Sequence, residues 1–252
     1  MSKKQDLISL GSRTARNGFR NEDDIVKKFH SWKSDADSQT WLVIMGYALK
    51  QIEKVEACKL HGFKTDVQIK ITIYMKEGVA AENLSIKLVS NPAGFNQVDK
   101  RWVDQYALLW DIPPEVIEAL KLFTGEIAPL PGRQLRDGRR MFFDELDAEA
   151  QRKVVSFFTQ NKILVVSDIL RGRGPFSAGW MLVALKADSK SKWELKSINQ
   201  AMNVFAAGDV EISPRGSLKI GKIGMQRKGG DGGRRTAQML QFKINPVELF
   251  GD

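Results

Sequence analysis

Three residues on two strand-like segments have the chemical types that phosphodiester hydrolysis requires. Asp66 stands where a loop enters one such segment, and Ser85 and Lys87 stand two apart on the next. Because side chains two apart on a strand project from one face, pairing of the two segments would bring all three together. The hydrolysis needs a metal ion that offsets charge on the phosphate and acidifies a water, plus a cation or base beside that water. A carboxylate and an ammonium placed in this way could meet both needs.

A magnesium ion at this place would need few protein ligands. Mg²⁺ prefers oxygen and keeps several waters, so Asp66, the main-chain carbonyl of Ile86 and a substrate phosphate could hold it. Glu22 is a further candidate, because it lies on the inward stripe of an expected helix, where an unpaired carboxylate is costly. Ordinary roles compete with these. An Asp before a strand is commonly a turn residue, a strand Lys is commonly solvated, and a Glu in a first helical turn complements the helix dipole.

The elements that must position these residues follow from the periodicity of apolar residues. Alternation of apolar and polar residues, or a short apolar run, predicts strands at 67–74, 84–89, 162–170, 180–187, 218–226 and 239–244. Spacing of three and four predicts helices at 21–32, 97–110, 114–124 and 148–161. Asn21 is the expected cap of the first helix. The predicted fold class is α/β or α+β, with a central mixed β-sheet flanked by helices.

Length and composition limit the classes of protein to which the chain can belong. The 252 residues show no repeat and no long linker, so a single domain over 1–252 is expected. Within it we expect an N-terminal helical arm at about 1–35, catalytic strands at about 62–90 and a C-terminal recognition region at about 165–245. One cysteine and two histidines exclude a disulfide framework and a Cys/His zinc site. A polar N-terminus and the absence of a membrane-length apolar run predict a cytoplasmic protein without a membrane partner.

The charge of the chain indicates a polyanionic partner. A formal net charge of +9 favours nucleic acid, with a merely solvated basic surface as the alternative. Seven Lys or Arg residues against one acidic residue lie between Arg215 and Arg235. Guanidinium and ammonium groups can address guanine O6 and N7, and a carboxylate can accept from the cytosine amino group. The alternative is a phosphate-binding or mobile loop. The candidate DNA contacts here are Arg215, Ser217, Gln226, Arg227, Lys228, Asp231 and Arg234.

Three other segments have features suited to DNA. Arg171 and Arg173 follow the strand expected at 162–170 and could reach bases or phosphates. Phe95 lies in a polar loop, where it could wedge between base pairs beside the amides of Asn96 and Gln97, unless it folds back on the core. Arg13, Arg16 and Arg20 are spaced to form one helical face that could lie along the DNA backbone or in a minor groove.

A chain-wide set of motifs resembles a known family. The motifs are LGSRTARNGFRNE, GFKTD, IKLVSN, GFNQVDK, DILRGRG, SPRGS, QRKGGD and MLQFKINPVELF. They resemble the small type II restriction endonucleases of the PD-(D/E)xK fold. The likeness is strongest to the HinP type, which cuts at GCGC, and MspI is more distant. The resemblance implies Mg²⁺-dependent cutting of double-stranded DNA by one or two ions, leaving 5′-phosphate and 3′-hydroxyl ends. It implies a monomer, with a weak dimer as the alternative.

The resemblance also assigns roles and exposes one departure. The Asp of GFKTD implies that Asp66 binds metal, and the Lys of SIK implies that Lys87 is catalytic. The family carries an acidic or amide side chain where this sequence has Ser85, which would reach the metal through a water. Thr65 keeps a hydroxyl near the scissile phosphate, and Glu22 falls within a matching helix. The departure keeps open an alternative function, a sequence-specific DNA-binding protein that has lost hydrolysis.

Overall fold

The computed structural model describes residues 20–60, 67–132, 134–186, 191–230 and 234–251. The chain forms two compact units. Unit 1 comprises Met1–Gly94, Leu170–Ala201 and Pro246–Asp252, and unit 2 comprises Phe95–Ile169 and Met202–Asn245. The chain therefore passes repeatedly between the units, and the single domain expected from the sequence stays a prediction.

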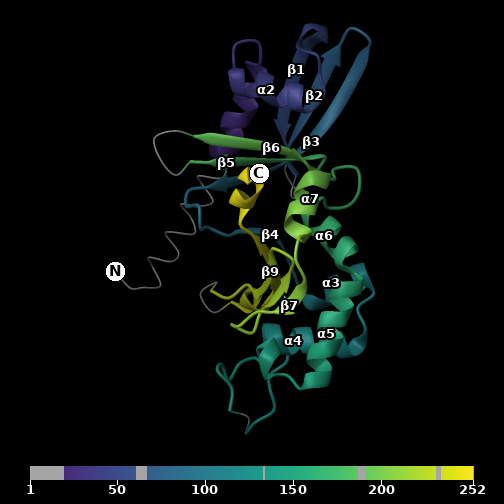
Figure 1. The fold of residues 1–252 in the computed structure, drawn as a ribbon, viewed down its shortest axis with the longest axis vertical. Coiled ribbons are helices and arrows are strands. Elements are labelled where there is room, and N and C mark those ends of the chain that lie inside the picture. The colour runs from purple at the N-terminus through teal and green to yellow at the C-terminus, as the bar shows by residue number, and fades with distance from the viewer. Residues whose placement is uncertain (1–19, 61–66, 133, 187–190, 231–233, 252) are drawn as a thin grey trace, which may run out of the picture. The chain divides into compact units, whose positions relative to one another are not determined.

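Unit 1 is built on a mixed sheet with the strand order β1-β2-β3-β5-β6. Its strands are β1 (Ile52–Lys59), β2 (Val67–Met75), β3 (Gly78–Val89), β5 (Trp180–Leu185) and β6 (Lys192–Ser197). Neighbouring strands are antiparallel except β3 and β5, which are parallel. The strands expected at 67–74, 84–89 and 180–187 are confirmed, and β3 occupies the centre of the sheet, as Figure 1 shows.

One face of this sheet is covered by a helical layer. Residues 20–30 are helical, and α2 (Ala36–Ile44) follows, capped by the Asp35 side chain, which accepts from the Ser38 amide at 2.8 Å. Ile25 and Phe29 are fully buried against Ile69 and Ile86, which confirms the amphipathic helix expected at 21–32. The cap assigned to Asn21 is wrong, because residue 20 is already helical and the side chain of Asn21 is buried within the helix.

The opposite face of the sheet carries a different layer. The C-terminal 3-10 helix η5 (Pro246–Phe250) packs against β3, β5 and β6, and Figure 1 shows it on the other side of β5 and β6 from α2. Leu84 and Ile86 belong to the core beneath the helices. Because strand side chains alternate, Ser85 and Lys87 project from the η5 face.

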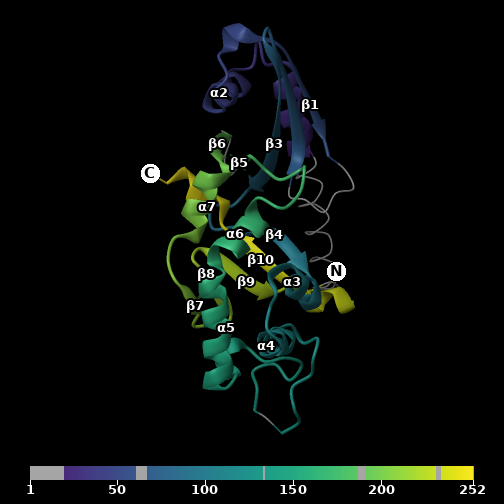
Figure 2. The same cartoon turned by 90° about the vertical axis from the view of Figure 1, so that its right-hand side faces the viewer.

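Unit 2 is built on an antiparallel sheet with the strand order β4-β10-β9-β8-β7. Its strands are β4 (Asn96–Arg101), β7 (Val210–Ile212), β8 (Leu218–Ile220), β9 (Ile223–Arg227) and β10 (Leu240–Ile244). The helices are α3 (Val103–Trp110), α4 (Pro114–Thr124), α5 (Ala148–Gln160) and α6 (Lys162–Leu170), with α7 (Ile198–Ala206) running from unit 1 into unit 2. Figure 2 shows α3, α4 and α5 beside this sheet. Short 3-10 helices are η1 (Leu49–Gln51), η2 (Phe143–Glu145) and η4 (Arg235–Gln238).

Aromatic side chains hold the core of unit 2 together. Tyr106 stacks on Trp110 with ring centroids 4.7 Å apart, and Phe242 of β10 meets both rings edge-on. Phe123 of α4 stacks on Phe143 of η2 at 4.1 Å. Such ring pairs add to the free energy gained from burying their area. They fix the strands of unit 2 against its helices.

Two predicted elements are wrong. Residues 162–170 form the helix α6 rather than a buried strand, since an apolar run alone does not distinguish the two. The buried residues Val165, Val166, Ile169 and Leu170 recur at helical spacing, while Ile163 is 80% exposed. Residues 96–101 form β4 rather than the start of a helix, because their main chain pairs with β10. The helices expected at 114–124 and 148–161 are confirmed, as are the strands at 218–226 and 239–244.

In the part of the chain that the structure describes, no helix is both long and apolar enough to cross a membrane.

Candidate active site and DNA interface

Lys87 and Ser85 form a buried polar pair on the central strand of unit 1. Lys87 is 5% exposed and Ser85 is fully buried, and their partners across β5 are the buried residues Val183 and Met181. Among the described residues, Ser85 Oγ has no hydrogen-bond partner, and the Lys87 ammonium makes no ion pair. Burying an ammonium or a hydroxyl without a partner costs free energy, so packing alone does not account for this polar pair on β3.

Asp66 and Thr65 lie outside the described residues, so their predicted roles are not tested. The residue that follows them, Val67, pairs with Ser85, and the register shifts between Val67 and Ile69. A bulge of this kind redirects side chains and is common beside functional sites. The start of β2 is thus next to the buried polar pair along the sheet.

Ile86 and Glu22 are described, but nothing in the structure tests their roles. The side chain of Ile86 enters the core, and its main chain lies opposite Leu182 of β5. Glu22 is half-buried in the helix at 20–30, which packs on the face of the sheet opposite Lys87. Among the described residues, no group of three or more His, Cys, Asp or Glu side chains could hold a metal ion.

Arg171 and Arg173 follow the helix α6, and not a strand as expected, yet their loop is firmly attached to β3. The Asn83 side chain donates to the carbonyl of Ser177 at 3.2 Å, and Gly179 N–H donates to the carbonyl of Asn83 at 3.0 Å. Both arginines are exposed. The loop at 171–179 therefore presents two exposed guanidinium groups from an anchored base.

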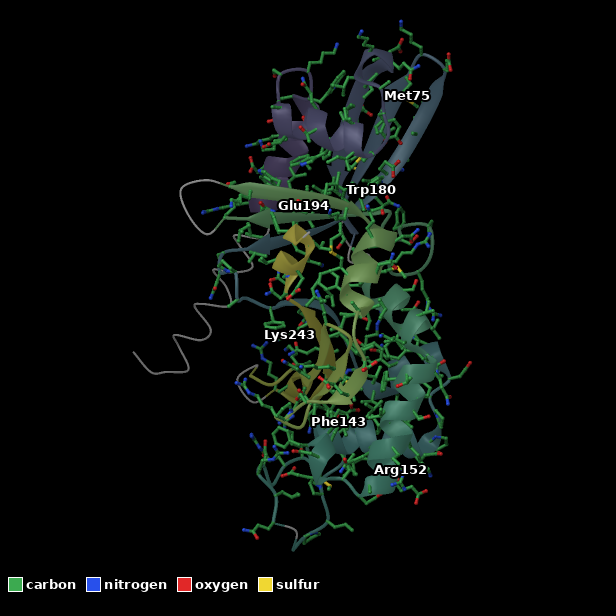
Figure 3. All side chains as sticks on the ribbon, viewed as in Figure 1. Met75, Phe143, Arg152, Trp180, Glu194 and Lys243 are labelled. Carbon is green, nitrogen blue, oxygen red and sulfur yellow. The ribbon has the colours of Figure 1, made fainter. Side chains whose placement is uncertain are left out.

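A carboxylate on β3 strengthens this attachment. Glu82 accepts hydrogen bonds from Trp180 Nε1 at 2.8 Å and from the Tyr47 hydroxyl at 2.6 Å. Burial and the hydrogen bond to Glu82 raise the pKa of the Tyr47 phenol above its ordinary value. Figure 3 labels Trp180, where the loop enters β5. These contacts were not expected from the sequence, because they join residues far apart along the chain.

Phe95 opens unit 2 with its ring in solvent. It is 59% exposed, and Asn96 and Gln97 begin β4 directly after it. The alternative that Phe95 folds back onto the core does not hold. Its proposed contact with DNA is not tested.

Arg215 and Ser217 lie in the tight turn between β7 and β8. Ser213 N–H donates to the carbonyl of Ser217 at 2.7 Å, and the two hydroxyl groups are 2.9 Å apart. Gly216 has a φ of +72°, a conformation that L side chains rarely adopt. Its carbonyl accepts from Phe143 N–H at 2.9 Å, which joins the turn to η2. Arg215 is exposed at the tip.

The remaining candidates cluster at the end of β9 and in the segment that follows it. Gln226 pairs with Gln241 of β10, and Lys228 N–H donates to the carbonyl of Met239 at 2.8 Å. Arg234 is exposed at the start of η4. Asp231, Arg13 and Arg16 lie outside the described residues, and Arg20 is in the helix at 20–30. No contact of these residues with DNA is tested.

One basic cluster was not foreseen in the sequence. Arg139 and Arg140, between α4 and η2, lie with Arg227 of β9 around the single carboxylate of Asp137. The motif RDGRR at 136–140 was available as a signal. It was overlooked because its partner Arg227 is about ninety positions away.

The fold is that of a restriction endonuclease. It matches the crystal structure of restriction endonuclease MspI in complex with its cognate DNA, with a TM-score of 0.62 and 13% sequence identity. The match covers 88% of this chain and 87% of that chain. The family model R.HinP1I restriction endonuclease matches residues 45–250, so this chain belongs to that family and is a type II site-specific deoxyribonuclease. No curated protein sequence matches the chain. The sequence resembled the HinP-type restriction endonucleases and, more distantly, MspI, and both resemblances are confirmed.

Proposed function

We propose that this restriction endonuclease is Mg²⁺-dependent and cuts double-stranded DNA at GCGC, leaving 5′-phosphate and 3′-hydroxyl ends. We further propose that the enzyme acts as a monomer in the cytoplasm. The observation that carries it is the buried Lys87 ammonium beside the unpartnered hydroxyl of Ser85 on β3. A packed strand of purely structural use would place apolar residues there, as β5 does with Met181 and Val183.

The candidate catalytic residues of unit 1 have different roles in hydrolysis. The Lys87 ammonium sits beside the scissile phosphate, where it orients the attacking water and stabilises negative charge that develops on the phosphate. The Thr65 hydroxyl donates a hydrogen bond to the same phosphate. Glu22 is given no step in this scheme, because its helix at 20–30 packs on the face of the sheet opposite Lys87.

The proposed donor set belongs to a site for one or two magnesium ions. Asp66 and the Ile86 carbonyl would hold the ion, and the Ser85 hydroxyl would reach it through a water, which fits its buried and unpartnered oxygen. When bound, magnesium neutralises phosphate charge and acidifies water. Because serine is shorter than the family's amide or acid, metal binding should be weaker than with those side chains.

DNA recognition is assigned to the basic residues of both units. From unit 1 come Arg13, Arg16 and the anchored arginines Arg171 and Arg173. From unit 2 come the exposed Phe95 with Asn96 and Gln97, and the residues of the turn between β7 and β8, of β9 and of the segment after β9, namely Arg215, Ser217, Gln226, Arg227, Lys228, Asp231 and Arg234. The exposed arginines Arg215 and Arg234 suit guanine O6 and N7, and Asp231 suits the cytosine amino group. The family match supports GCGC as the site.

Plasmid digestion with sequencing of the ends tests the proposal. With Mg²⁺ we expect discrete fragments whose ends lie within GCGC, and with EDTA we expect none. Plasmid that is retarded but intact in Mg²⁺ would contradict hydrolysis, and ends within another sequence would contradict the proposed site.

A further inference from the structure

The cluster of Arg139, Arg140 and Arg227 around Asp137 has more positive charge than its carboxylate can neutralise. Asp137 accepts from Arg139 Nε at 2.8 Å and from the Arg139 terminal nitrogen at 3.0 Å. These hydrogen bonds are the main reason why the pKa of Asp137 is lowered to about 2. Arg140 Nε lies 3.5 Å from Asp137, and the nearest nitrogen of Arg227 lies 4.0 Å away. Three guanidinium groups therefore share one carboxylate that Arg139 already occupies.

Arg140 and Arg227 are also partly removed from water. Their side chains are 16% and 13% exposed, and the Nε atom of each is buried without a hydrogen-bond partner in the described residues. Burial lowers the pKa of both groups, and for Arg140 the nearby charge of Arg227 lowers it further. The two guanidinium groups repel each other, and water is partly excluded from them. Binding of an anion would therefore stabilise both charges.

The surroundings hold this pair in a fixed position. The Arg140 guanidinium lies 4.0 Å from the centroid of the Phe142 ring, and the Arg136 guanidinium lies 4.2 Å from the same centroid. Arg136 is itself neutralised by ion pairs with Asp144 and Glu145. Arg140 is thus ordered by stacking while its charge remains available, as a preorganised anion site requires.

We propose that Arg140 and Arg227, with Arg139 beside them, bind a backbone phosphate of DNA. Guanidinium groups bind phosphate oxygens through paired, charge-assisted hydrogen bonds. The cluster is in the same part of unit 2 as the Arg215 turn, because Phe143 N–H donates to the carbonyl of Gly216 at 2.9 Å. The identity of the anion as DNA rests on the proposed function. In that function the site positions the duplex without reading its sequence.

The competing explanation is purely structural. Stacking on Phe142 and the partial neutralisation by Asp137 would then be the whole purpose of the cluster. The two explanations differ for Asp137→Asn. If the cluster binds phosphate, removing the competing carboxylate tightens DNA binding, whereas a structural cluster would lose stability without gaining affinity.

The test measures fluorescence anisotropy of labelled duplexes in EDTA at several salt concentrations, with a GCGC duplex and a scrambled one. Arg140→Gln keeps most of the aliphatic stem and removes the charge. We expect it to weaken binding of both duplexes about tenfold and to reduce the slope of log affinity against log salt by about one. Arg140→Lys should keep most of the slope. Arg152→Ala is the matched control, because Arg152 is exposed on α5 (Figure 3), and it should leave the slope unchanged.

Unchanged affinity and slope in Arg140→Gln, with a wild-type melting temperature, would overturn the phosphate site. A loss confined to the GCGC duplex would also overturn it, because it would show base reading. If Arg140→Gln melts early, the comparison moves to Asp137→Asn, where tighter binding supports the site and unchanged or weaker binding overturns it. The proposed function fails separately, when the wild-type protein binds DNA in EDTA but cuts nothing in Mg²⁺.

Discussion

At the scale of single residues, several buried polar groups have no hydrogen-bond partner among the described residues, and some of them lie at the two places proposed to serve DNA. Ser85 on β3 and the Nε atoms of Arg140 and Arg227 are all in this state. Buried polar groups in folded proteins nearly always have partners, so each exception calls for a reason. Under the two proposals, a metal-bound water at Ser85 and a phosphate at the two arginines give a reason at both places.

Ser85→Ala should raise the thermal stability and lower the activity. The change removes a buried hydroxyl without a partner, so we expect a gain of about 1 kcal/mol in the free energy of unfolding. The Mg²⁺ concentration needed for half-maximal cleavage should rise severalfold. Ser38→Ala is the matched control, since Ser38 is equally buried but its hydroxyl donates to the carbonyl of Asp35 at 3.1 Å. It should lose stability. A loss of stability in Ser85→Ala would show that the hydroxyl is hydrogen-bonded after all.

Asp137 should give the folded protein an acid-sensitive component of stability. Its pKa falls from 3.8 to about 2 on folding, chiefly through the hydrogen bonds from Arg139. A lowered pKa stabilises the fold above pH 3.8, and this contribution is lost as the pH falls towards 2. The difference in melting temperature between wild type and Asp137→Asn should therefore shrink across that window. A difference independent of pH would contradict the assigned ion pairing.

At the scale of elements, the turn between β7 and β8 depends on Gly216, because this position has no room for a side chain. A Cβ at Gly216 would lie 2.2 Å from an Asp144 oxygen and 2.7 Å from Phe142 Cβ, and the φ of +72° adds strain. Gly216→Ala should therefore cost about 2 kcal/mol or more of stability. It should also weaken DNA binding, by displacing Phe142 and with it Arg140.

Gly132→Ala separates strain from steric conflict in that experiment. Gly132 has a φ of +89°, but a Cβ there would meet nothing within 4 Å. It should cost only the strain, about 1 kcal/mol, and leave DNA binding intact. Equal losses of stability and affinity in the two variants would contradict the packing described for Gly216. Urea unfolding and anisotropy measure both quantities.

The sequence predicted the helices and strands that show their own apolar periodicity. It was wrong for segments whose secondary structure depends on packing or pairing with other segments. Residues 67–74 and 114–124 carry their own pattern, and the structure has β2 and α4 there. Residues 162–170 are apolar throughout, so only packing, with Ile163 outward and Val165 inward, selects a helix. Residues 96–101 have no strand pattern and become β4 by pairing with β10.

The candidate site, too, was predictable where it depends on a local pattern and not where it depends on distant segments. Ser85 and Lys87 were predicted to share a face because alternation is local, and both are buried on that face. Burial of Lys87 was not predictable, since β5 comes almost a hundred residues later. The arginine cluster was missed for a similar reason, because its charge balance depends on Arg227 meeting Asp137 across the fold.

At the scale of the whole molecule, the chain builds two units from interleaved segments. Unit 1 contains β3 with Lys87, and unit 2 contains the Arg215 turn and the arginine cluster. No linker marks the boundary, because the chain crosses between units in short connections, and composition alone therefore indicated one domain. The net charge of +9 was readable from composition, and it fits a protein whose ligand is a polyanion.

The central claim is that Lys87 serves hydrolysis of DNA, and single-turnover cleavage of a GCGC duplex in Mg²⁺ by wild type and Lys87→Ala tests it most directly. We expect the variant to cut at least 100-fold more slowly while binding the duplex as tightly and melting no earlier, because it loses a buried charge that has no ion pair among the described residues. Lys54→Ala, on the edge strand β1, is the control and should cut like wild type. Cleavage by Lys87→Ala at the wild-type rate would contradict the account.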